Sequence, residues 1–526
     1  MDAVIILLAL LAGLIFRRFN YPPLLGYLLA GFAAHELEAL EYISAGNIDI
    51  ITPLADIGIL LLLFTIGLKL NLRSLAAPHV WGTALIHMVI AVVLTVPVIM
   101  AAGYWMPALE VADSVSAWTL AFALSFSSTV FAVKIFDERG ESASFHASTA
   151  IGVLIIQDIL AVCFLVFTAE KAIGPSALIL LALPLIRPLL LYLQKLSGHG
   201  ELLVLFGVVC ALGGAELFEA VNLKGGLGAL LFGVLLGNNE RSNELYKNLL
   251  NLKDLFLIGF FLQIGYYGLP SLEMLYVAFT LALLIFLRPV IYYFLLVFFK
   301  VRARTAFLSG IALFNYSEFG LIVASIAVSM SILSPEWLTT LALAMSISFF
   351  IATPFNTKVH DLFNKNYIFL DKFEREQRLP QEIIPSIGDA KVAILGMGRV
   401  GLGTYESLRE IYKDKVVCIE ENQLRVNKYS NSGVNCIHGD ANDYEFWNQS
   451  TLLDCEKIFV CLSNHRENMY VVELARQVGY KNTLAVVSHF ADEQEELERF
   501  GCIAFNLYAE AGHGFAEHVL TELKKR

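Results

Sequence analysis

The stretch from Gly152 to Val162, "GVLIIQDILAV", places a glutamine and an aspartate side by side in the middle of an otherwise apolar helical run. A carboxylate at the centre of a membrane span costs at least about 3 kcal/mol on insertion scales, so it needs a partner or a function. Ionisable residues inside spans are functional by default. The stretch therefore predicts a helical membrane protein with its working site at Gln157 and Asp158.

The composition of the chain supports a polytopic membrane protein. Of its 526 residues 57% are hydrophobic and 16% are charged, a balance that a soluble core could not hide. Apolar runs of spanning length recur through residue 356, and we count thirteen of them. With the N-terminus outside, basic residues gather in the inner loops, and only Lys171 and Lys224 fall in outer loops. This bias predicts a cytoplasmic C-terminus.

Two other spans carry polar clusters near their middle. These are "SFSSTVFA" from Ser125 to Ala132 and "FNYSEFG" from Phe314 to Gly320. Hydroxyls and amides there can satisfy the backbone groups that a break in a helix exposes. The two spans are seven apart, so we expect two inverted repeats with matching interrupted helices, which is how many transporters build their binding sites. Helix packing through small hydroxyl residues is the alternative interpretation of each cluster alone.

The chemistry expected of this site is an exchange of monovalent cations. A carboxylate among hydroxyls and carbonyls suits an unsolvated monovalent cation, and burial lets a proton compete for it. One acid beside the neutral Gln157 predicts an electroneutral exchange of one proton for one cation. Arg288, in "IFLRPV", is a further charge at depth and is expected to pair with Asp158 or Glu318. The expected ion- and proton-binding residues are Asp158, Gln157, Ser127, Ser128, Thr129, Ser317, Glu318, Arg288 and Asn315.

The membrane part resembles a known family. "QD" at 157 and 158, "SST" at 127 to 129, "SEF" at 317 to 319, "LLFTIGLKL" at 62 to 70 and the basic residue at 288 are similar to Kef-type potassium/proton antiporters, of the second branch of the monovalent cation/proton antiporter superfamily. The resemblance implies that Asp158 binds K⁺ or a proton in turn, and that the protein is a homodimer in the bacterial inner membrane. It implies a transporter and not an enzyme.

Two other functions stay open at this point. The family's "GLEL" and "GQGSEF" are replaced here by "GLKL" and "FNYSEF", which leaves a sodium/proton antiporter as an alternative. A potassium channel gated by the soluble part is a third reading, although channels of that kind carry a carbonyl filter such as TVGYG, which this sequence lacks. The net charge of −11 and the lack of a basic patch argue against nucleic-acid binding.

A soluble domain is predicted at residues 389–526, after the membrane domain at 1–358 and a polar linker at 359–388. Apolar strand-like runs alternate there with helical stretches, as in a parallel sheet with crossover helices. "VAILGMGRVG", from Val392 to Gly401, contains the G-x-G-x-x-G pattern, and Glu420 ends the next strand about 20 residues later. The expected nucleotide-binding residues are Gly396, Gly398, Arg399, Val400, Gly401, Glu420, Asp440 and Ser463. A Rossmann scaffold without nucleotide is the alternative.

This domain resembles the regulatory RCK or TrkA-N domains that gate potassium transport. The resemblance implies a regulatory nucleotide, for which we expect AMP, with NAD(H) and ATP as alternatives. The glutathione gating of Kef systems is not expected, because the region that carries basic residues in those systems reads "GTYESLRE" here, with Glu406. The odd number of cysteines, seven, and the absence of a CxxC motif favour a reduced cytoplasmic domain.

Overall fold

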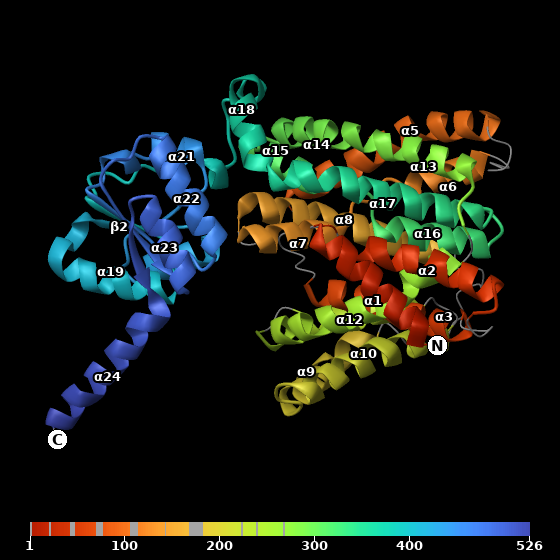
Figure 1. The fold of residues 1–526 in the computed structure, drawn as a ribbon, viewed down its shortest axis with the longest axis horizontal. Coiled ribbons are helices and arrows are strands. Elements are labelled where there is room, and N and C mark those ends of the chain that lie inside the picture. Colours follow the sequence, from red (N-terminus) through yellow and green to blue (C-terminus); the bar gives the residue numbers. More distant parts are fainter. Residues whose placement is uncertain are drawn as a thin grey trace. The chain divides into compact units, whose positions relative to one another are not determined.

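The computed structural model describes residues 3–19, 21, 23–42, 48–69, 77–105, 114–141, 144–167, 182–221, 225–237, 240–266 and 269–525. The chain divides into two compact units. The first comprises Met1–Ala132, Ala150–Phe299 and Ala306–Leu362, and the second comprises Val133–Thr149, Lys300–Thr305 and Phe363–Arg526. Figure 1 shows that the first is helical and that the second contains the sheet.

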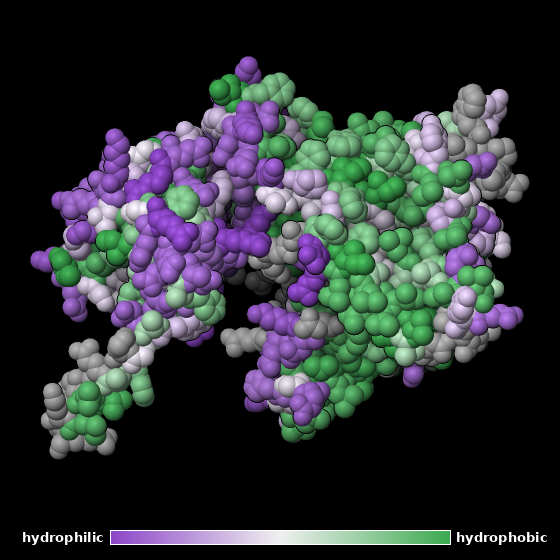
Figure 2. Space-filling model, in the orientation of Figure 1, coloured by the Kyte–Doolittle hydropathy of each residue, from purple (hydrophilic) through white to green (hydrophobic). Residues whose placement is uncertain are grey.

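Most of the helices that belong wholly or partly to the first unit lie roughly side by side (Figure 1). They are α1 (Ala3–Arg18), α2 (Leu24–Ala39), α3 (Ile48–Lys69), α5 (Pro78–Trp105), α6 (Ser114–Ala123), α7 (Thr129–Arg139), α8 (Phe145–Phe167), α9 (Leu183–Leu196), α10 (Glu201–Glu219), α11 (Gly225–Leu236), α12 (Glu240–Tyr266), α13 (Leu272–Leu283), α14 (Leu287–Phe298), α15 (Ala303–Ala312), α16 (Glu318–Ser329), α17 (Glu336–Thr357) and α18 (Val359–Asp371). Large apolar side chains such as Ile6, Val89 and Leu185 are exposed on these helices. Figure 2 accordingly shows a mainly hydrophobic surface over this unit, as a lipid-facing surface requires.

Helices of spanning length are present among the described residues. Five are long and apolar enough to cross a membrane, and three shorter apolar helices are Ser114–Ala123, Phe145–Ala161 and Glu318–Ser329. The number of crossings stays a prediction. The outer-loop residues Lys171 and Lys224 and the side chain of Lys69 lie outside the described residues.

The helices of the first unit pack in two groups. In one group α3 contacts α10, α11 and α12, and α2 contacts α1 and α12. In the other group α5 contacts α6 and α14, α16 contacts α6 and α17, and α13 contacts α17. The contact between α12 and α17 joins the groups. The second group contains the helices that carry the two polar clusters.

Both helical interruptions that the sequence predicts are present. The helix that begins at Ser114 stops at Ala123 and resumes at Thr129, and the helix that begins at Ala303 stops at Ala312 and resumes at Glu318. A break leaves carbonyls at the end of the first half and N–H groups at the start of the second without helical partners. In an apolar surrounding each of these must be satisfied by a nearby polar group.

The sheet of the second unit has six parallel strands in the order β3-β2-β1-β4-β5-β6. The strands are β1 (Val392–Leu395), β2 (Val416–Glu420), β3 (Cys436–His438), β4 (Lys457–Val460), β5 (Thr483–Ser488) and β6 (Ile503–Asn506). Because side chains alternate along a strand, Ala393 and Leu395 join one hydrophobic core and Val392 and Ile394 join another on the opposite face. Burial on both faces explains the continuous apolar runs in the sequence.

Helices cover both faces of this sheet (Figure 1). They are α19 (Arg399–Tyr412), α20 (Gln423–Asn431), α21 (Tyr444–Gln449), α22 (His465–Gln477) and α23 (Ala491–Arg499). The last helix, α24 (Leu507–Lys525), follows β6 and extends away from the sheet (Figure 1). The surface of this part is largely hydrophilic (Figure 2). The seven cysteines are unpaired.

Candidate functional site

Gln157 and Asp158 lie on α8, and both side chains are buried, with 0% and 2% of their surface exposed. The Asp158 carboxylate accepts a hydrogen bond from Thr129 Oγ1, with 3.2 Å between Oγ1 and Oδ2. Thr129 is the first residue of α7. The N-terminal end of a helix carries a partial positive charge, so the break places favourable electrostatics beside this carboxylate.

Gln157 uses both ends of its amide to hold other parts of the site. Its Oε1 accepts from the Ser127 N–H over 2.9 Å, which satisfies an N–H that the first break exposes. Its Nε2 donates to the Tyr292 hydroxyl over 2.9 Å. Gln157 is therefore a neutral side chain that links α8 to the first break and to α14 by hydrogen bonds.

The second break meets the first directly. Asn315 Oδ1 accepts from the Ser128 N–H over 2.9 Å, and Ser128 Oγ donates to Glu318 Oε2 over 2.9 Å. Ser317 caps α16 by accepting from the Phe319 N–H over 3.1 Å. The predicted residues of both clusters thus form one hydrogen-bonded group, in which serine and asparagine side chains supply what the broken helices lack.

Arg288 corrects one prediction from the sequence. It was expected to pair with Asp158 or Glu318, but among the described residues it forms no ion pair with either. Its guanidinium donates instead to the carbonyls of Phe126 and Leu124 at the first break and to the carbonyl of Asn315 at the second.

Arg288 also donates to Ser127 Oγ over 3.1 Å, and it lies 4.6 Å from the centre of the Tyr316 ring. The physical reason is the helix dipole. The carbonyl ends of two half-helices carry partial negative charge, and one planar cation with five donors satisfies both at once.

Sequence reasoning missed Tyr292 and His87. The Tyr292 hydroxyl contacts both Gln157 Nε2 and Ser127 Oγ, at 2.9 and 3.2 Å. The His87 ring stacks on the Tyr292 ring with centroids 3.8 Å apart. An aromatic residue in an apolar span reads as ordinary packing, and only the spacing to a polar partner on another helix reveals the role. No local sequence signal could have found either residue.

The arrangement can bind a cation or a proton at buried oxygens. Half-helix N-termini face the two carboxylates, and half-helix C-termini face Arg288, as in transporters built on discontinuous helices. Glu318 Oε1 and Asn315 Nδ2 are buried and have no hydrogen-bond partner among the described residues. The site therefore keeps polar atoms uncommitted close to Asp158.

The predicted nucleotide site lies at the carboxyl edge of the sheet. The order β3-β2-β1-β4 reverses between β1 and β4, and such switch points form the ligand crevice of open parallel sheets. Gly396 follows β1 with φ of +93°, a conformation that other residues rarely adopt. A Cβ on Gly401 would lie 2.0 Å from the Gly396 carbonyl oxygen, so the loop closes tightly.

The remaining loop residues leave room for a phosphate. Gly398 is the N-cap of α19, and a Cβ built on it meets no atom within 4 Å. Arg399 and Val400 form the first turn of α19, where free N–H groups favour an anion. Ser463 is exposed and follows β4 on the other side of the switch point. These residues fit a nucleotide phosphate.

Glu420 and Asp440 are held by neighbours within the second unit. Glu420 accepts from the N–H groups of Met397 and Asn422, at 3.0 Å each, and so supports the glycine loop. Each of its oxygens still has a lone pair for a ribose hydroxyl. Asp440 Oδ2 pairs with Arg304 Nη1 at 2.7 Å. The nucleotide-binding roles of both residues stay predictions.

Comparison with known proteins identifies the family. The family described as "Sodium/hydrogen exchanger, transmembrane" matches residues 5–357, which is more than half of the chain. The chain belongs to this sodium/hydrogen exchanger family. The TrkA-N domain family matches residues 392–505 of the same exchanger. The Kef-type resemblance and the fold expected from the sequence are thereby confirmed: a helical antiporter domain and a Rossmann-like TrkA-N domain.

The exchanger is also similar to individual proteins and solved structures. It is 26% identical over 524 residues to "Putative cation/proton antiporter YbaL" of Escherichia coli (strain K12), covering 93% of this chain and 91% of that protein. The sodium proton antiporter MjNhaP1 of Methanocaldococcus jannaschii aligns over 69% of this chain and 96% of its own, with 14% identity and a TM-score of 0.46. The NAD(P)-binding domain of an Archaeoglobus fulgidus exopolyphosphatase-related protein aligns over 25% of this chain and 98% of its own, with 16% identity and a TM-score of 0.24.

Proposed function

We propose that this antiporter exchanges one K⁺ for one H⁺ by alternating access, with Asp158 as the carrier that the two ions share. The observation that carries the proposal is the place of Asp158, which is buried on α8 and bonded to Thr129 at the N-terminal end of a half-helix. An ion or a proton that neutralises this carboxylate removes the charge that makes a buried site unfavourable.

The one-for-one stoichiometry follows from the neighbours of Asp158. Gln157 is neutral, and both ends of its amide are engaged. Arg288 stays charged throughout and is fixed on carbonyls. The site loaded with K⁺ and the site loaded with H⁺ therefore carry the same charge. Only these two loaded states cross the membrane in this cycle, so no net charge moves.

A sodium/proton exchanger is the second candidate, and it is favoured by the name of the matching family. The test is proton flux in liposomes that contain the purified protein, with K⁺, Na⁺, Rb⁺ and Li⁺ added in turn. The potassium proposal expects K⁺ and Rb⁺ to drive the flux. Flux with Na⁺ or Li⁺ but not with K⁺ would replace potassium by sodium and leave the exchange mechanism intact.

The assembly and the location belong to the same proposal. We infer a homodimer in the bacterial inner membrane, with the N-terminus outside and the TrkA-N domain in the cytoplasm. The division of the helices into two packing groups supports a mobile group that contains α6, α14 and α16, to which Gln157 of α8 is hydrogen-bonded through Tyr292, and a second group that forms the dimer contact. Cross-linking of the full chain in membranes checks the dimer.

We also infer that AMP regulates the exchange by binding at the switch point of the Rossmann sheet, with NAD(H) and ATP as alternatives. The open space above Gly398 at the N-terminal end of α19 supports this site. Gly398→Trp fills that space and is expected to abolish AMP binding to the full chain. Gly403→Trp is the matched control, because a Cβ at Gly403 also meets no atom within 4 Å.

Equilibrium binding of AMP to both variants decides the matter. If Gly398→Trp binds AMP as the wild type does, the site lies elsewhere. If the wild type binds neither AMP, NADH nor ATP at millimolar concentration, the Rossmann domain is a scaffold without nucleotide.

A further inference from the structure

Three helices of the ion site begin or end in the second unit. α7 ends and α8 begins within Val133–Thr149, and α15 begins within Lys300–Thr305. The same helices carry Thr129, Asp158 and the approach to the second break. A helix of ten residues, such as α15, is about 15 Å long and moves largely as a rigid rod. A displacement of its first turn therefore reaches its far end.

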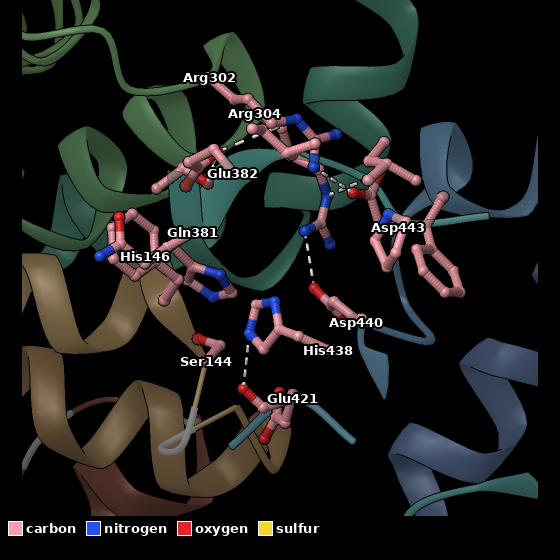
Figure 3. Close-up of a pocket in the computed structure, with 17 residues that line it drawn as sticks. Ser144, His146, Arg302, Arg304, Gln381, Glu382, Glu421, His438, Asp440 and Asp443 are labelled. Carbon is pink, nitrogen blue, oxygen red and sulfur yellow. Dashed lines mark hydrogen bonds and ion pairs between the residues drawn. The ribbon is translucent and has the colours of Figure 1, made fainter. Parts of the chain in front are cut away.

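Two buried arginines, Arg302 directly before α15 and Arg304 in its first turn, form ion pairs with carboxylates of the Rossmann domain. Arg302 Nη1 lies 2.8 Å from Asp443 Oδ2, and Arg302 Nη2 lies 2.6 Å from Glu445 Oε2. Arg304 Nη1 lies 2.7 Å from Asp440 Oδ2, and Figure 3 shows its side chain reaching toward Asp440 and Asp443. Both arginine side chains are less than one tenth exposed. Because both arginines are buried, these pairs are weakly screened by salt.

The carboxylates come from one short segment after β3. Asp440 and Asp443 lie in the loop between β3 and α21, and Glu445 lies in the first turn of α21. This loop leaves the carboxyl edge of the sheet, the edge on which the nucleotide is proposed to bind. Burial alone would raise the pKa of Asp443, but Arg302 and Arg304 lower it to about 2. Asp443 is therefore charged at any physiological pH.

The connection between α7 and α8 reaches the same region. Ser144 and His146 line a cavity of about 50 Å³ together with Arg304, His438 and Asp440 (Figure 3). A cavity of this size holds a few water molecules and is too small for a nucleotide. The cavity lies where several segments of the second unit meet, next to the edge of the sheet at which the nucleotide is proposed to bind.

The chain at the end of α7 also lies close to the Rossmann domain. Gly140 follows α7 with φ of +79°, and a Cβ there would lie 2.6 Å from Glu467 Oε2 of α22. His146 Nε2 lies 3.0 Å from Glu141 Oε2 in the α7–α8 connection. The cytoplasmic ends of α7 and α8 are therefore packed against the same domain that holds the first turn of α15.

We infer that Arg302 and Arg304 are positioning residues that transmit a change at the carboxyl edge of the Rossmann sheet to the break between α15 and α16. The inference rests on the proposed nucleotide regulation and names the element through which it reaches the ion site. Nucleotide binding shifts the loop between β3 and α21, and the buried ion pairs carry the shift to α15. Asn315, just after α15, then moves relative to Ser128 in the first break.

The first test is Asp443→Asn in the full chain, reconstituted in liposomes. Asparagine keeps the N-cap that Asp443 gives to the Glu445 N–H, and it removes the charge that Arg302 requires. The wild type is expected to show a change in exchange rate of at least about fivefold on adding AMP. The variant is expected to bind AMP as the wild type does while the ratio of rates with and without AMP falls to about 1. A ratio that stays at the wild-type value overturns the inference.

The control is Glu456→Gln, which removes the exposed ion pair of Lys391 and Glu456 on the same domain. It is expected to keep the full effect of AMP. Arg302→Lys keeps a positive charge opposite Asp443 and Glu445. It is expected to retain part of the effect of AMP on the exchange rate that Arg302→Gln loses. Equal loss in both arginine variants would overturn the role of the ion pairs, because charge would then not be what links the start of α15 to the loop after β3.

A second measurement does not depend on the nucleotide. Amide hydrogen exchange of the full chain without AMP is compared between the wild type, Asp443→Asn and Glu456→Gln. Asp443→Asn is expected to raise exchange across residues 306–318, and Glu456→Gln is not. Faster exchange confined to Lys300–Thr305 and α21 would overturn the inference. If AMP has no effect on the rate of ion exchange by the wild type, the proposed nucleotide regulation fails. The hydrogen-exchange measurement alone then decides the role of Arg302 and Arg304.

Discussion

At the scale of single residues, the site consists of one proposed carrier and several neighbours whose side chains are held by hydrogen bonds. Among the described residues, Asp158 receives one side-chain hydrogen bond, from Thr129, whereas Gln157 joins three elements and Arg288 bridges two breaks. An ion-binding residue must change its bonding partners during the transport cycle, whereas a residue that holds the site together must keep them. The number of bonds that each side chain makes therefore agrees with its proposed role.

Glu318 tests whether a second carboxylate takes part in transport. Ser128 Oγ holds one of its oxygens at 2.9 Å, and glutamine can accept that bond through its own oxygen. Glu318→Gln is therefore expected to slow exchange by less than about tenfold, equivalent to roughly 1.4 kcal/mol, and to leave it electroneutral. The measurement is proton flux with a voltage-sensitive dye present. Net charge movement in the variant, or a loss as complete as that of an Asp158 variant, would assign Glu318 a carrier role.

At the scale of elements, the two broken helices are the feature that the sequence revealed best. A serine-rich or asparagine-rich cluster at mid-span has few other uses in an apolar environment, so the breaks at 124–128 and 313–317 could be expected. The partners of Arg288 could not be expected. Every residue has a backbone carbonyl, so no sequence pattern marks the carbonyls of Leu124 and Asn315 as acceptors.

Contacts that depend on distant segments were also out of reach. Tyr292 and Gln157 are 135 residues apart, and Arg304 and Asp440 are 136 apart. Asp440 follows a strand at the position that suggested a nucleotide contact, and the structure pairs it with an arginine that the sequence assigned to a loop between spans. A single sequence carries no record of such pairs.

Arg288→Lys tests the joining of the two breaks. Lysine keeps the charge but offers three donors from one point, so it cannot reach carbonyls of both breaks in the geometry of a guanidinium. We expect a loss of stability on the order of 2 kcal/mol, because charged hydrogen bonds contribute roughly that much each. Thermal unfolding of the purified protein measures it.

The same variant in an Asp158→Asn background distinguishes the structure from the ion pair expected from the sequence. Since Arg288 bonds carbonyls and not Asp158, the two effects on stability should add. An interaction energy of more than about 1 kcal/mol between the two changes would show that Arg288 and Asp158 interact, as the sequence led us to expect.

At the scale of the whole molecule, the chain joins an ion exchanger to a Rossmann domain through helices that the two units share. α7, α8 and α15 each have residues in both units. A regulatory domain connected by a flexible tether could act only by binding elsewhere on the transporter. In the mechanism that we infer, the helices that bear the proposed ion site are themselves the connection, and a signal enters α15 at Arg302 and Arg304.

The acidic residues of the second unit predict how its stability depends on pH. Burial raises the pKa of Glu467 from 4.5 to about 8, with a further contribution from Asp440 that outweighs the hydrogen bond from Asn442, and Glu141 and Glu420 also raise it. The folded protein therefore holds a proton that the unfolded chain releases near pH 4.5. The resulting stabilisation is complete below pH 4.5 and is lost as the pH rises through about 8.

Glu467→Gln removes this dependence. The variant should match the wild type near pH 5 and be more stable at pH 9, on the order of 2 kcal/mol. Thermal unfolding at both values checks it, with Glu473→Gln as the control, an exposed residue of the same helix. A variant that loses stability at pH 9 would show that Glu467 is charged and paired in the folded protein.

The central claim is that Asp158 alone carries both ions, one for one. The most direct measurement is K⁺-driven proton flux in liposomes, recorded together with membrane voltage, for the wild type and Asp158→Asn. The control is Asp361→Asn, the same change at an exposed residue in the first turn of α18, outside the predicted spans. We predict wild-type flux without voltage, control flux equal to it, and no flux from Asp158→Asn. Exchange that survives in Asp158→Asn, or wild-type exchange that builds up a voltage, would contradict the account.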